Sequence, residues 1–456
     1  MNIRTYRRMA WWLALIITLL VLSGILTLAW GNAGAKLFIV NTLSRDLAVF
    51  DIAADRSLGA IPLNEHGYRV AFSPDGQMAY VTASSEVMLS RQAPRAELAD
   101  ATQPVGLLII DLREGRVIDQ IALPISPLAN VHIAPDGRWA YVVTAGPPGL
   151  RNAVRGRVLV VDLPQRSLLK TINIGLNPLD SVIAPNGATL FSADWGSRSI
   201  SVVDLHEGRL LDTIPLGLFA ARMLAMPPTG KTLYTVLETP DAALHSGQGQ
   251  MSQNNMYTQA FSPNSAGATL AEIDIDTRKM TLLPIDVPGA ITAIAVSPDG
   301  ARLYTYGTVP VGQQMKRQQE LQQAQQSAQI RQEAYALSVI DLEQQAIINS
   351  FPAEGYLSAL AVSPDGRKIY LIGAPGDPAR EAATQRNVST QIQNNNRTRI
   401  DGTADATQRA DDTVAAILQD LSQLPKTLIV LDADTGERLT TLPLGSLPQG
   451  HGITGP

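Results

Sequence analysis

The side chains that could do chemistry in this sequence are few, and the histidines come first. They number five: His66, His132, His206, His245 and His451. Imidazole and carboxylate ligands together hold Zn²⁺ and similar metals, so His66 and His451 could share a site with Glu65 or Asp180. No ligand spacing typical of a metal site accompanies them. The alternative is that each is an ordinary loop or strand histidine, and no metal site is predicted.

Two further groups could contact a ligand or a partner. Asp194, Trp195 and Gly196 follow an apolar run and offer a carboxylate beside an indole; the alternative is a structural turn with a packed indole ring. The second group lies in expected loops at one end of the repeated units, and its members are Tyr68, Arg69, Arg222 and Tyr356. Together with His66 and His451, these two groups make up the predicted site for a ligand or a protein partner.

Several kinds of chemistry are excluded by composition and by missing motifs. The chain has no cysteine, which rules out disulfides, thiolate metal sites, cysteine nucleophiles, covalent c-type haem and a lipoprotein anchor. It also lacks the G-x-S-x-G elbow, the H-E-x-x-H motif and a phosphate-binding glycine loop. No catalytic residue and no cofactor are therefore predicted. The net charge of −5 indicates no nucleic-acid surface.

A repeated turn in the sequence indicates the strands that must position these residues. Ser297-Pro298-Asp299-Gly300 stands between two β-prone runs, with proline and glycine where a tight turn needs them. Similar turns occur at 73–76, 134–137, 184–187, 226–230 and 363–366. Further apolar runs end in seven regularly placed aspartates, namely Asp51, Asp111, Asp162, Asp204, Asp274, Asp341 and Asp432. Their sevenfold repetition favours a turn-capping role over catalysis.

Four short strands per unit predict an all-β fold, a seven-bladed β-propeller over residues 36–456. The chain enters at the second strand of a blade near Leu37 and ends on a fragment that matches a first strand, 450–454. We expect these two ends to pair, which closes the ring and removes exposed sheet edges. The alternative is an open solenoid or two domains.

The repeat resembles that of YVTN-type seven-bladed β-propellers. The likeness rests on Tyr80-Val81-Thr82, on runs such as Val202-Val203-Asp204 and on the Ser-Pro-Asp-Gly turns. The V-G-x-x-P step of that family appears loosely at 174–178. The resemblance implies the propeller fold, and its relatives include surface proteins, lactonase-like enzymes and propeller subunits of periplasmic amine dehydrogenases. It implies no single function.

The N-terminus predicts a membrane anchor. Residues 1–8 are basic, with Arg4, Arg7 and Arg8, and residues 9–30 form an uncharged apolar run long enough to cross a bilayer. The positive flank predicts a cytoplasmic N-terminus and a propeller outside the cytoplasm, in the periplasm or on the cell surface. The small residues Ala33-Gly34-Ala35 leave cleavage as the alternative.

Extra sequence is concentrated between the second and third strands of the blades. The insertions fall near 84–103, 145–155, 238–268, 309–334 and 374–425. Helical spacing of apolar residues predicts partly helical segments at 313–333 and 411–424. In a propeller these connections share one face, and repeat proteins commonly bind through such a face.

Two functions remain open on these observations. The first is a membrane-anchored, extracytoplasmic binding or scaffold module whose insertion-bearing face docks a protein partner or a surface polymer, with a subunit of a membrane complex as one form of this function. The second is a periplasmic enzyme of lactonase-like or dehydrogenase-subunit type that works at the channel mouth. His66, Arg69, His132 and His451 would be the residues to test for the second function.

Overall fold

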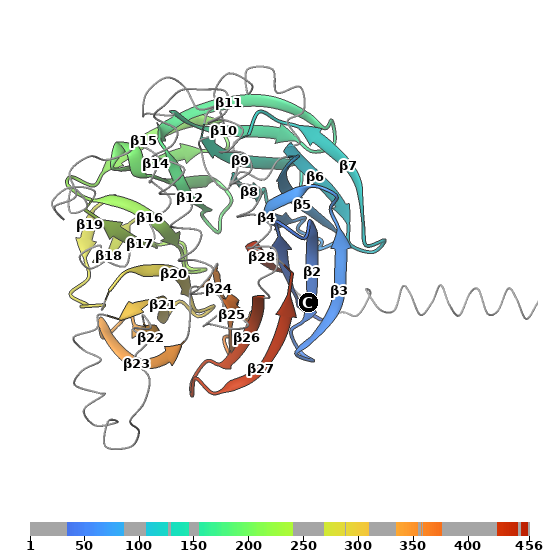
Figure 1. Ribbon diagram of the computed structural model, residues 1–456. Helices are drawn as coiled ribbons and strands as arrows, with labels where there is room; N and C mark the ends of the chain where they lie inside the picture. The colour runs from blue at the N-terminus through green and yellow to red at the C-terminus, as the bar shows by residue number, and fades with distance from the viewer. Residues whose placement is uncertain are drawn as a thin grey trace, which may run out of the picture.

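The computed structural model describes residues 34–454, without 86–105, 126–128, 146–154, 240–268, 288, 310–333, 354–356, 358, 376–425 and 446–447. Seven four-stranded antiparallel sheets are arranged as blades around a central axis (Figure 1). This confirms the predicted all-β, seven-bladed propeller. Within the described residues the one helix is a 3-10 turn, η2 (Trp195–Ser197). Nothing in the described part of the chain is a helix suited to crossing a bilayer. The apolar run 9–30 and the two segments expected to be helical lie outside it.

The first four blades follow the chain from its start. Blade 1 is β28 (Pro448–Thr454), β1 (Lys36–Asn41), β2 (Asp46–Asp51) and β3 (Arg56–Pro62). Blade 2 is β4 (His66–Phe72), β5 (Met78–Ser84), β6 (Gly106–Asp111) and β7 (Arg116–Ala122). Blade 3 is β8 (Asn130–Ile133), β9 (Trp139–Ala145), β10 (Arg155–Asp162) and β11 (Ser167–Leu176). Blade 4 is β12 (Pro178–Ile183), β13 (Thr189–Asp194), β14 (Ser199–Asp204) and β15 (Arg209–Pro215).

Three blades complete the ring. Blade 5 is β16 (Ala220–Ala225), β17 (Thr232–Glu238), β18 (Thr269–Asp274) and β19 (Met280–Leu282). Blade 6 is β20 (Ile291–Val296), β21 (Arg302–Val309), β22 (Ala334–Asp341) and β23 (Ala346–Ala353). Blade 7 is β24 (Ala359–Val362), β25 (Lys368–Pro375), β26 (Lys426–Asp432) and β27 (Arg438–Leu444).

The ring closes by pairing the two ends of the chain. In Figure 1 the red β28 lies beside the blue strands of blade 1, and its residues pair antiparallel with β1, for example His451 with Ile39. Gly450 lies so close to β4 that a Cβ there would be 2.3 Å from the carbonyl oxygen of Tyr68. The predicted closure is confirmed, and it gives β1 a hydrogen-bonded neighbour on both sides.

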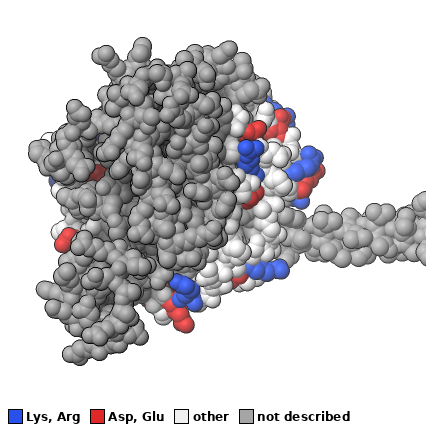
Figure 2. All heavy atoms as spheres, viewed as in Figure 1, with Lys and Arg blue, Asp and Glu red and all other residues white. Residues whose placement is uncertain are grey.

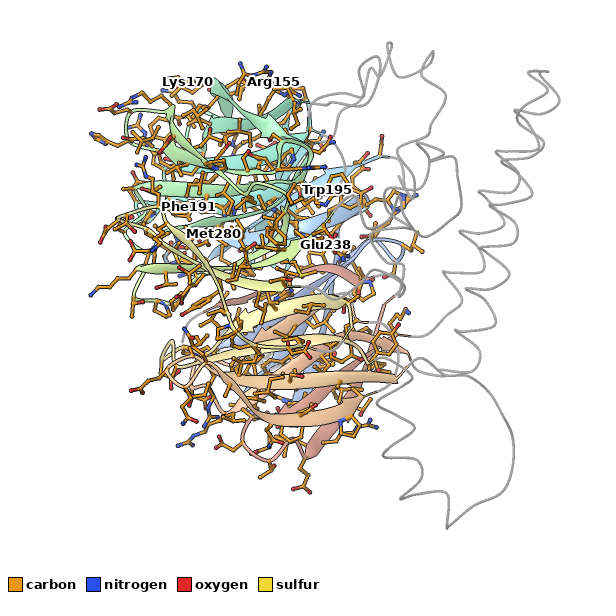
Figure 3. All side chains as sticks on the ribbon, turned by 90° about the vertical axis from the view of Figure 1, so that its left-hand side faces the viewer. Arg155, Lys170, Phe191, Trp195, Glu238 and Met280 are labelled. Atoms are coloured by element: carbon orange, nitrogen blue, oxygen red, sulfur yellow. The ribbon has the colours of Figure 1, made fainter. Side chains whose placement is uncertain are left out.

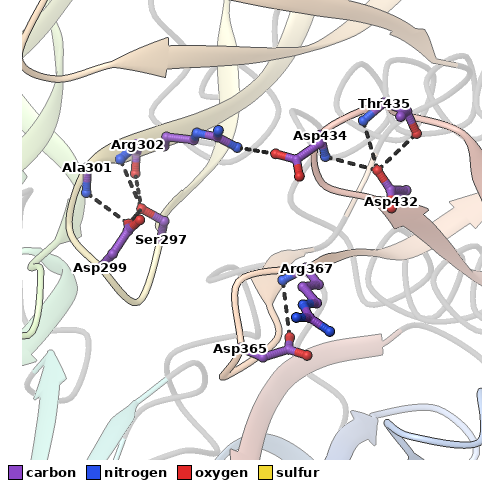
Figure 4. A network of polar contacts seen from close by, with 9 residues as sticks. All are labelled: Ser297, Asp299, Ala301, Arg302, Asp365, Arg367, Asp432, Asp434 and Thr435. Carbon is purple, nitrogen blue, oxygen red and sulfur yellow. Dashed lines mark hydrogen bonds and ion pairs between the residues drawn. The ribbon is translucent and has the colours of Figure 1, made fainter.

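The repeated turns form one face of the propeller, called here the turn face. In each serine-bearing turn the aspartate accepts a hydrogen bond from the serine hydroxyl, as in Ser297 to Asp299 at 2.5 Å (Figure 4). Each turn glycine has a positive φ, such as 69° at Gly187. The position of a Cβ on Gly187 would be 2.4 Å from Cγ of Pro135, one blade back. Proline and glycine of successive turns therefore pack together around the channel.

The seven repeated aspartates cap the turns between third and fourth strands. The carboxylate of Asp432, for example, accepts hydrogen bonds from the backbone nitrogens of Asp434 at 3.1 Å and Thr435 at 2.8 Å (Figure 4). The residue four positions after each aspartate has a positive φ, and these residues are Asp55, Gly115, Arg166, Gly208, Arg278, Gln345 and Gly436. The capping interpretation is confirmed. Some of these turns also bridge blades, as Asp434 does by pairing with Arg302 at 2.7 Å.

The opposite face, called here the insertion-bearing face, holds the ends of the second strands. Five blades connect their second strand to their third through long segments, and these segments are 85–105, 146–154, 239–268, 310–333 and 376–425. Blades 1 and 4 make the same connection through 42–45 and 195–198. Trp195 and Glu238, which stand where β13 and β17 end, lie along the same edge of the propeller (Figure 3).

Candidate functional site

A polar pocket opens in the central channel where the innermost strands of blades 2, 3 and 4 meet. Its volume is about 380 Å³. We call it the channel pocket, and it is lined by Arg69, Val70, Ala71, Asn130, Val131, His132, Ile133, Asp180, Ser181 and Ile183. Its polar residues come from β4, β8 and β12. The pocket therefore combines apolar walls with a few converging polar groups, as ligand sites do.

Asn130 links a cation to a carboxylate across three blades. Arg69 Nε donates to Asn130 Oδ1 at 3.2 Å, and Asn130 Nδ2 donates to Asp180 Oδ1 at 3.3 Å. A second guanidinium nitrogen of Arg69 donates to the carbonyl oxygen of Tyr68 at 3.2 Å. The amide thus holds the positions of both charged side chains.

Asp180 is the half-buried carboxyl group of this pocket. It accepts backbone hydrogen bonds from its neighbour Ser181 at 2.8 Å and from Leu224 of β16 at 2.9 Å. Burial raises the pKa of Asp180, while these hydrogen bonds and the charge of Arg69 act in the opposite direction. One carboxylate consequently connects the innermost strands of three successive blades.

His132 lies deeper along the same wall. Its Nε2 is 2.8 Å from the hydroxyl oxygen of Ser181 on the neighbouring blade. Burial lowers the pKa of His132 to about 4, so the imidazole is neutral near pH 7. His132 thus stands in the innermost strand β8 and lines the channel pocket.

Both His66 and His451 belong to strands. His66 begins β4 and is buried, with its Nδ1 2.8 Å from the carbonyl oxygen of Thr42. Because a carbonyl only accepts, this nitrogen carries the proton. His451 lies inside β28, and its pKa is lowered to about 4, first by burial and then by the charge of Arg69.

Tyr68 and Arg222 also lie in strands, and β-bulges explain why the sequence pattern placed them in loops. The pairing register shifts between Gly67 and Arg69 in β4 and between Ala221 and Met223 in β16. An extra residue in a bulge breaks the alternation by which a strand is recognised. The side chains of both are buried, and Nη1 of Arg222 is 2.8 Å from Oε1 of Glu238.

Asp194 supports the interblade connection that precedes β12. It is fully buried and accepts hydrogen bonds from the hydroxyls of Ser192 at 2.8 Å and Ser201 at 2.5 Å. It also accepts one from the backbone nitrogen of Gly175 at 3.1 Å. Burial raises its pKa to about 6. The backbone nitrogen of Trp195 donates to the carbonyl oxygen of Asn177 at 3.2 Å, so both residues hold this turn in place.

The structure brings some of the predicted residues together and separates others. Arg69 lines the channel pocket, and the charge of Arg69 reaches His451. Arg222 and Trp195 stand nearer the insertion-bearing face, while Tyr356 lies outside the described residues. Among the residues that the structure describes, no three histidine, aspartate or glutamate side chains form a group that could hold a metal ion.

Sequence reasoning missed Asn130 and Ser181 and treated Asp180 solely as a conceivable metal ligand. A signal was available in the alignment of the repeats. Relative to the second strand, Arg69, Asn130 and Asp180 occupy one equivalent position, opposite Thr82, Val143 and Ala193. The same position is Met223, Ala293 and Ala359 in blades 5 to 7. Polar residues in three successive blades and apolar ones in the next three mark this part of the channel.

Comparisons with known proteins support the fold. No family model matches the chain, and no curated protein matches it. The YVTN resemblance is therefore not confirmed by a family model. Among solved structures, the chain is similar to Kuenenia stuttgartiensis hydrazine synthase, with a TM-score of 0.52 and 18% sequence identity. The match covers 73% of this chain and 88% of the other. At this identity the likeness concerns the fold alone.

Proposed function

We propose that this protein is a membrane-anchored, extracytoplasmic scaffold that docks a protein partner through its insertion-bearing face. The observation that carries the proposal is the one-sided placement of the long connections. Five of the seven blades carry them between the second and third strands, whereas the turns on the opposite face stay short and uniform. Loops that vary on a rigid framework are where repeat proteins place their binding residues.

The anchor and the surface charge fit this proposal. The uncharged run 9–30 follows three arginines, the arrangement of a segment that leaves its N-terminus in the cytoplasm. On the described surface visible in Figure 2, basic and acidic side chains are interspersed and no large basic area appears. A protein partner suits such a surface better than a nucleic acid. The propeller would then work in the periplasm or at the cell surface.

The test is purification of the full chain from native membranes in mild detergent, followed by intact-mass and subunit mass spectrometry. We expect an uncut N-terminus and a partner in fixed stoichiometry. In a variant, residues 239–268 are replaced by Trp-Gly-Ser-Arg, the connection that blade 4 uses between Asp194 and Ser199. If this insertion contributes to docking, the variant loses partner while its melting temperature stays close to that of the parent. Recovery of the full chain alone would overturn the proposal.

A second candidate is an enzyme that works in the channel, because Arg69, His132, Asp180 and Ser181 converge on one pocket. It predicts turnover of a small substrate, such as a lactone, that falls at least tenfold in Arg69→Gln. His66 is a poor candidate for this role because its ring is held by Thr42. Turnover that is unchanged in Arg69→Gln and in His132→Phe would remove this candidate.

A further inference from the structure

The channel pocket contains charged side chains that the propeller fold does not require. At the position of Arg69, Asn130 and Asp180, blades 5 to 7 carry Met223, Ala293 and Ala359 and still form complete sheets. Arg69 and Asp180 are both half-buried, and partial burial of a charged group carries a desolvation cost that its contacts must offset. The three polar residues are therefore better explained by something that enters the pocket.

The size of the pocket suits a small molecule. Its volume is about 380 Å³. This lies at the small end of the range for ligand pockets. Val131, Ile133 and Ile183 supply apolar wall to the same pocket. A compact ligand with one charged end and a short apolar body would match both parts.

The charges of the pocket indicate which charged group the ligand would carry. Arg69 is the one cation among its lining residues. Asp180 already accepts hydrogen bonds from Ser181, Leu224 and Asn130, and the imidazoles of His132 and His451 are neutral near pH 7. A guanidinium forms its strongest contacts with planar anions such as a carboxylate, and the low dielectric of a narrow channel strengthens them. An ionised Asp180 repels any anion, and it repels a dianion such as phosphate more strongly than a monocarboxylate.

We propose that the channel pocket binds a small monocarboxylate, with Arg69 contacting its carboxylate and Asn130 fixing the guanidinium in place. This inference goes beyond partner docking, because it concerns the interior of the channel and does not depend on what covers the insertion-bearing face. Arg69→Gln removes the charge at the contact. Arg69→Lys keeps the charge and loses the planar fork, so it should bind with intermediate affinity.

The experiment uses the full chain in detergent and ligand-observed NMR titration with acetate, lactate and benzoate, beside acetamide and inorganic phosphate. We expect saturable binding of at least one carboxylate, at least tenfold weaker in Arg69→Gln, with acetamide and phosphate not binding. Arg209→Gln, at an exposed arginine on the outer strand β15, is the matched control and should bind like the parent. Asp180→Asn should tighten the carboxylate and admit phosphate.

Three results would overturn the proposal. The first is equal carboxylate binding by the parent and Arg69→Gln, and the second is equal binding of acetamide and acetate. The third is the absence of saturation by any of the three carboxylates up to about 10 mM, which corresponds to a binding free energy weaker than about −3 kcal/mol. Far-UV circular dichroism checks that each variant is folded. If Arg69→Gln does not fold, Arg69→Lys and Asp180→Asn provide the same decision, because the proposal predicts opposite changes in affinity for them.

Discussion

At the turn face, the aspartates of the repeated turns are exposed, whereas towards the insertion-bearing face Asp180 is half-buried and Asp194 is fully buried. The serine hydroxyl and a backbone N–H lower the pKa of Asp299, and Asp75 and Asp365 follow the same pattern. Burial instead raises the pKa of Asp180 and Asp194. At the turn face the hydrogen bonds of the turn therefore favour the ionised aspartate, whereas at the other end burial disfavours it.

This difference distinguishes the residues of the repeated framework from the candidate functional residues. The turn face repeats the same contacts from blade to blade, such as the glycine of one turn against the proline of the turn before it. The other end departs from the repeat in polar residues, bulges and connection length. Residues that recur in every blade hold the ring together, and residues that break the repeat are the candidates for function.

The largest effect should come from breaking the ring itself. Deleting residues 448–456 removes β28, which is the partner of β1 and a neighbour of β4. An unpaired β1 would expose a sheet edge, and we expect loss of the cooperative unfolding transition or aggregation. Thermal unfolding with light scattering measures this. Deleting residues 455–456 alone is the control and should change neither quantity.

The next effect concerns the buried ion pair at the end of β17. Arg222→Met leaves the Glu238 carboxylate without its partner in a largely buried place, which should cost about 3–4 kcal/mol of unfolding free energy. Adding Glu238→Gln should restore part of the loss. The exposed pair of Arg209 with Glu207 is the contrast, since Arg209→Met should leave the urea midpoint unchanged. Equal losses in the two arginine variants would show that burial does not distinguish them.

A pH series sharpens the comparison of the two ends. The pKa of Asp194 is about 6 in the folded protein and near 3.8 in the unfolded chain. The folded state then binds more protons between these values, so the Asp194 contribution lowers stability by about 2–3 kcal/mol as pH rises from about 4 to 7. Asp194→Asn should flatten the dependence of the urea midpoint over that range.

Asp299→Asn gives the opposite sign at the turn face. The folded pKa of Asp299 is lowered, so its stabilisation is present above about pH 4 and lost as pH falls through the folded pKa. This variant should differ from the parent mainly above pH 4 and less at pH 3. An unchanged slope between pH 4 and 7 in Asp194→Asn would contradict the assignment of that slope to Asp194.

The smallest effect distinguishes the free-energy cost of backbone conformation from that of side-chain packing at the turn face. Gly76 and Gly187 have φ values of 66° and 69°, but a Cβ on Gly76 would meet nothing within 4 Å. Gly76→Ala should cost about 1 kcal/mol for its left-handed conformation alone. Gly187→Ala should cost about 1–2 kcal/mol more because it also meets Pro135. Equal costs, measured by urea unfolding, would mean that the proline contact is unimportant.

The fold was predictable because its signals repeat. The capping aspartates and the Pro-Asp-Gly turns act through their immediate neighbours, so sequence alone reveals them, and the matching ends of the chain predicted the pairing of β28 with β1. Arg69, Asn130 and Asp180 are about one blade apart in sequence and meet through the closure of the ring. Bulges at Tyr68 and Arg222 hid their strands, because one extra residue reverses the alternation.

Hydrogen–deuterium exchange tests the central claim most directly, by comparing the full chain alone with the chain in the complex isolated from native membranes. We predict that partner binding protects peptides at the ends of the second strands, around Ser84, Asp194 and Glu238. Exchange in the turns at 73–76 and 297–300 should stay unchanged. Protection confined to those turns would contradict the account, because it would place the partner on the uniform face of the propeller.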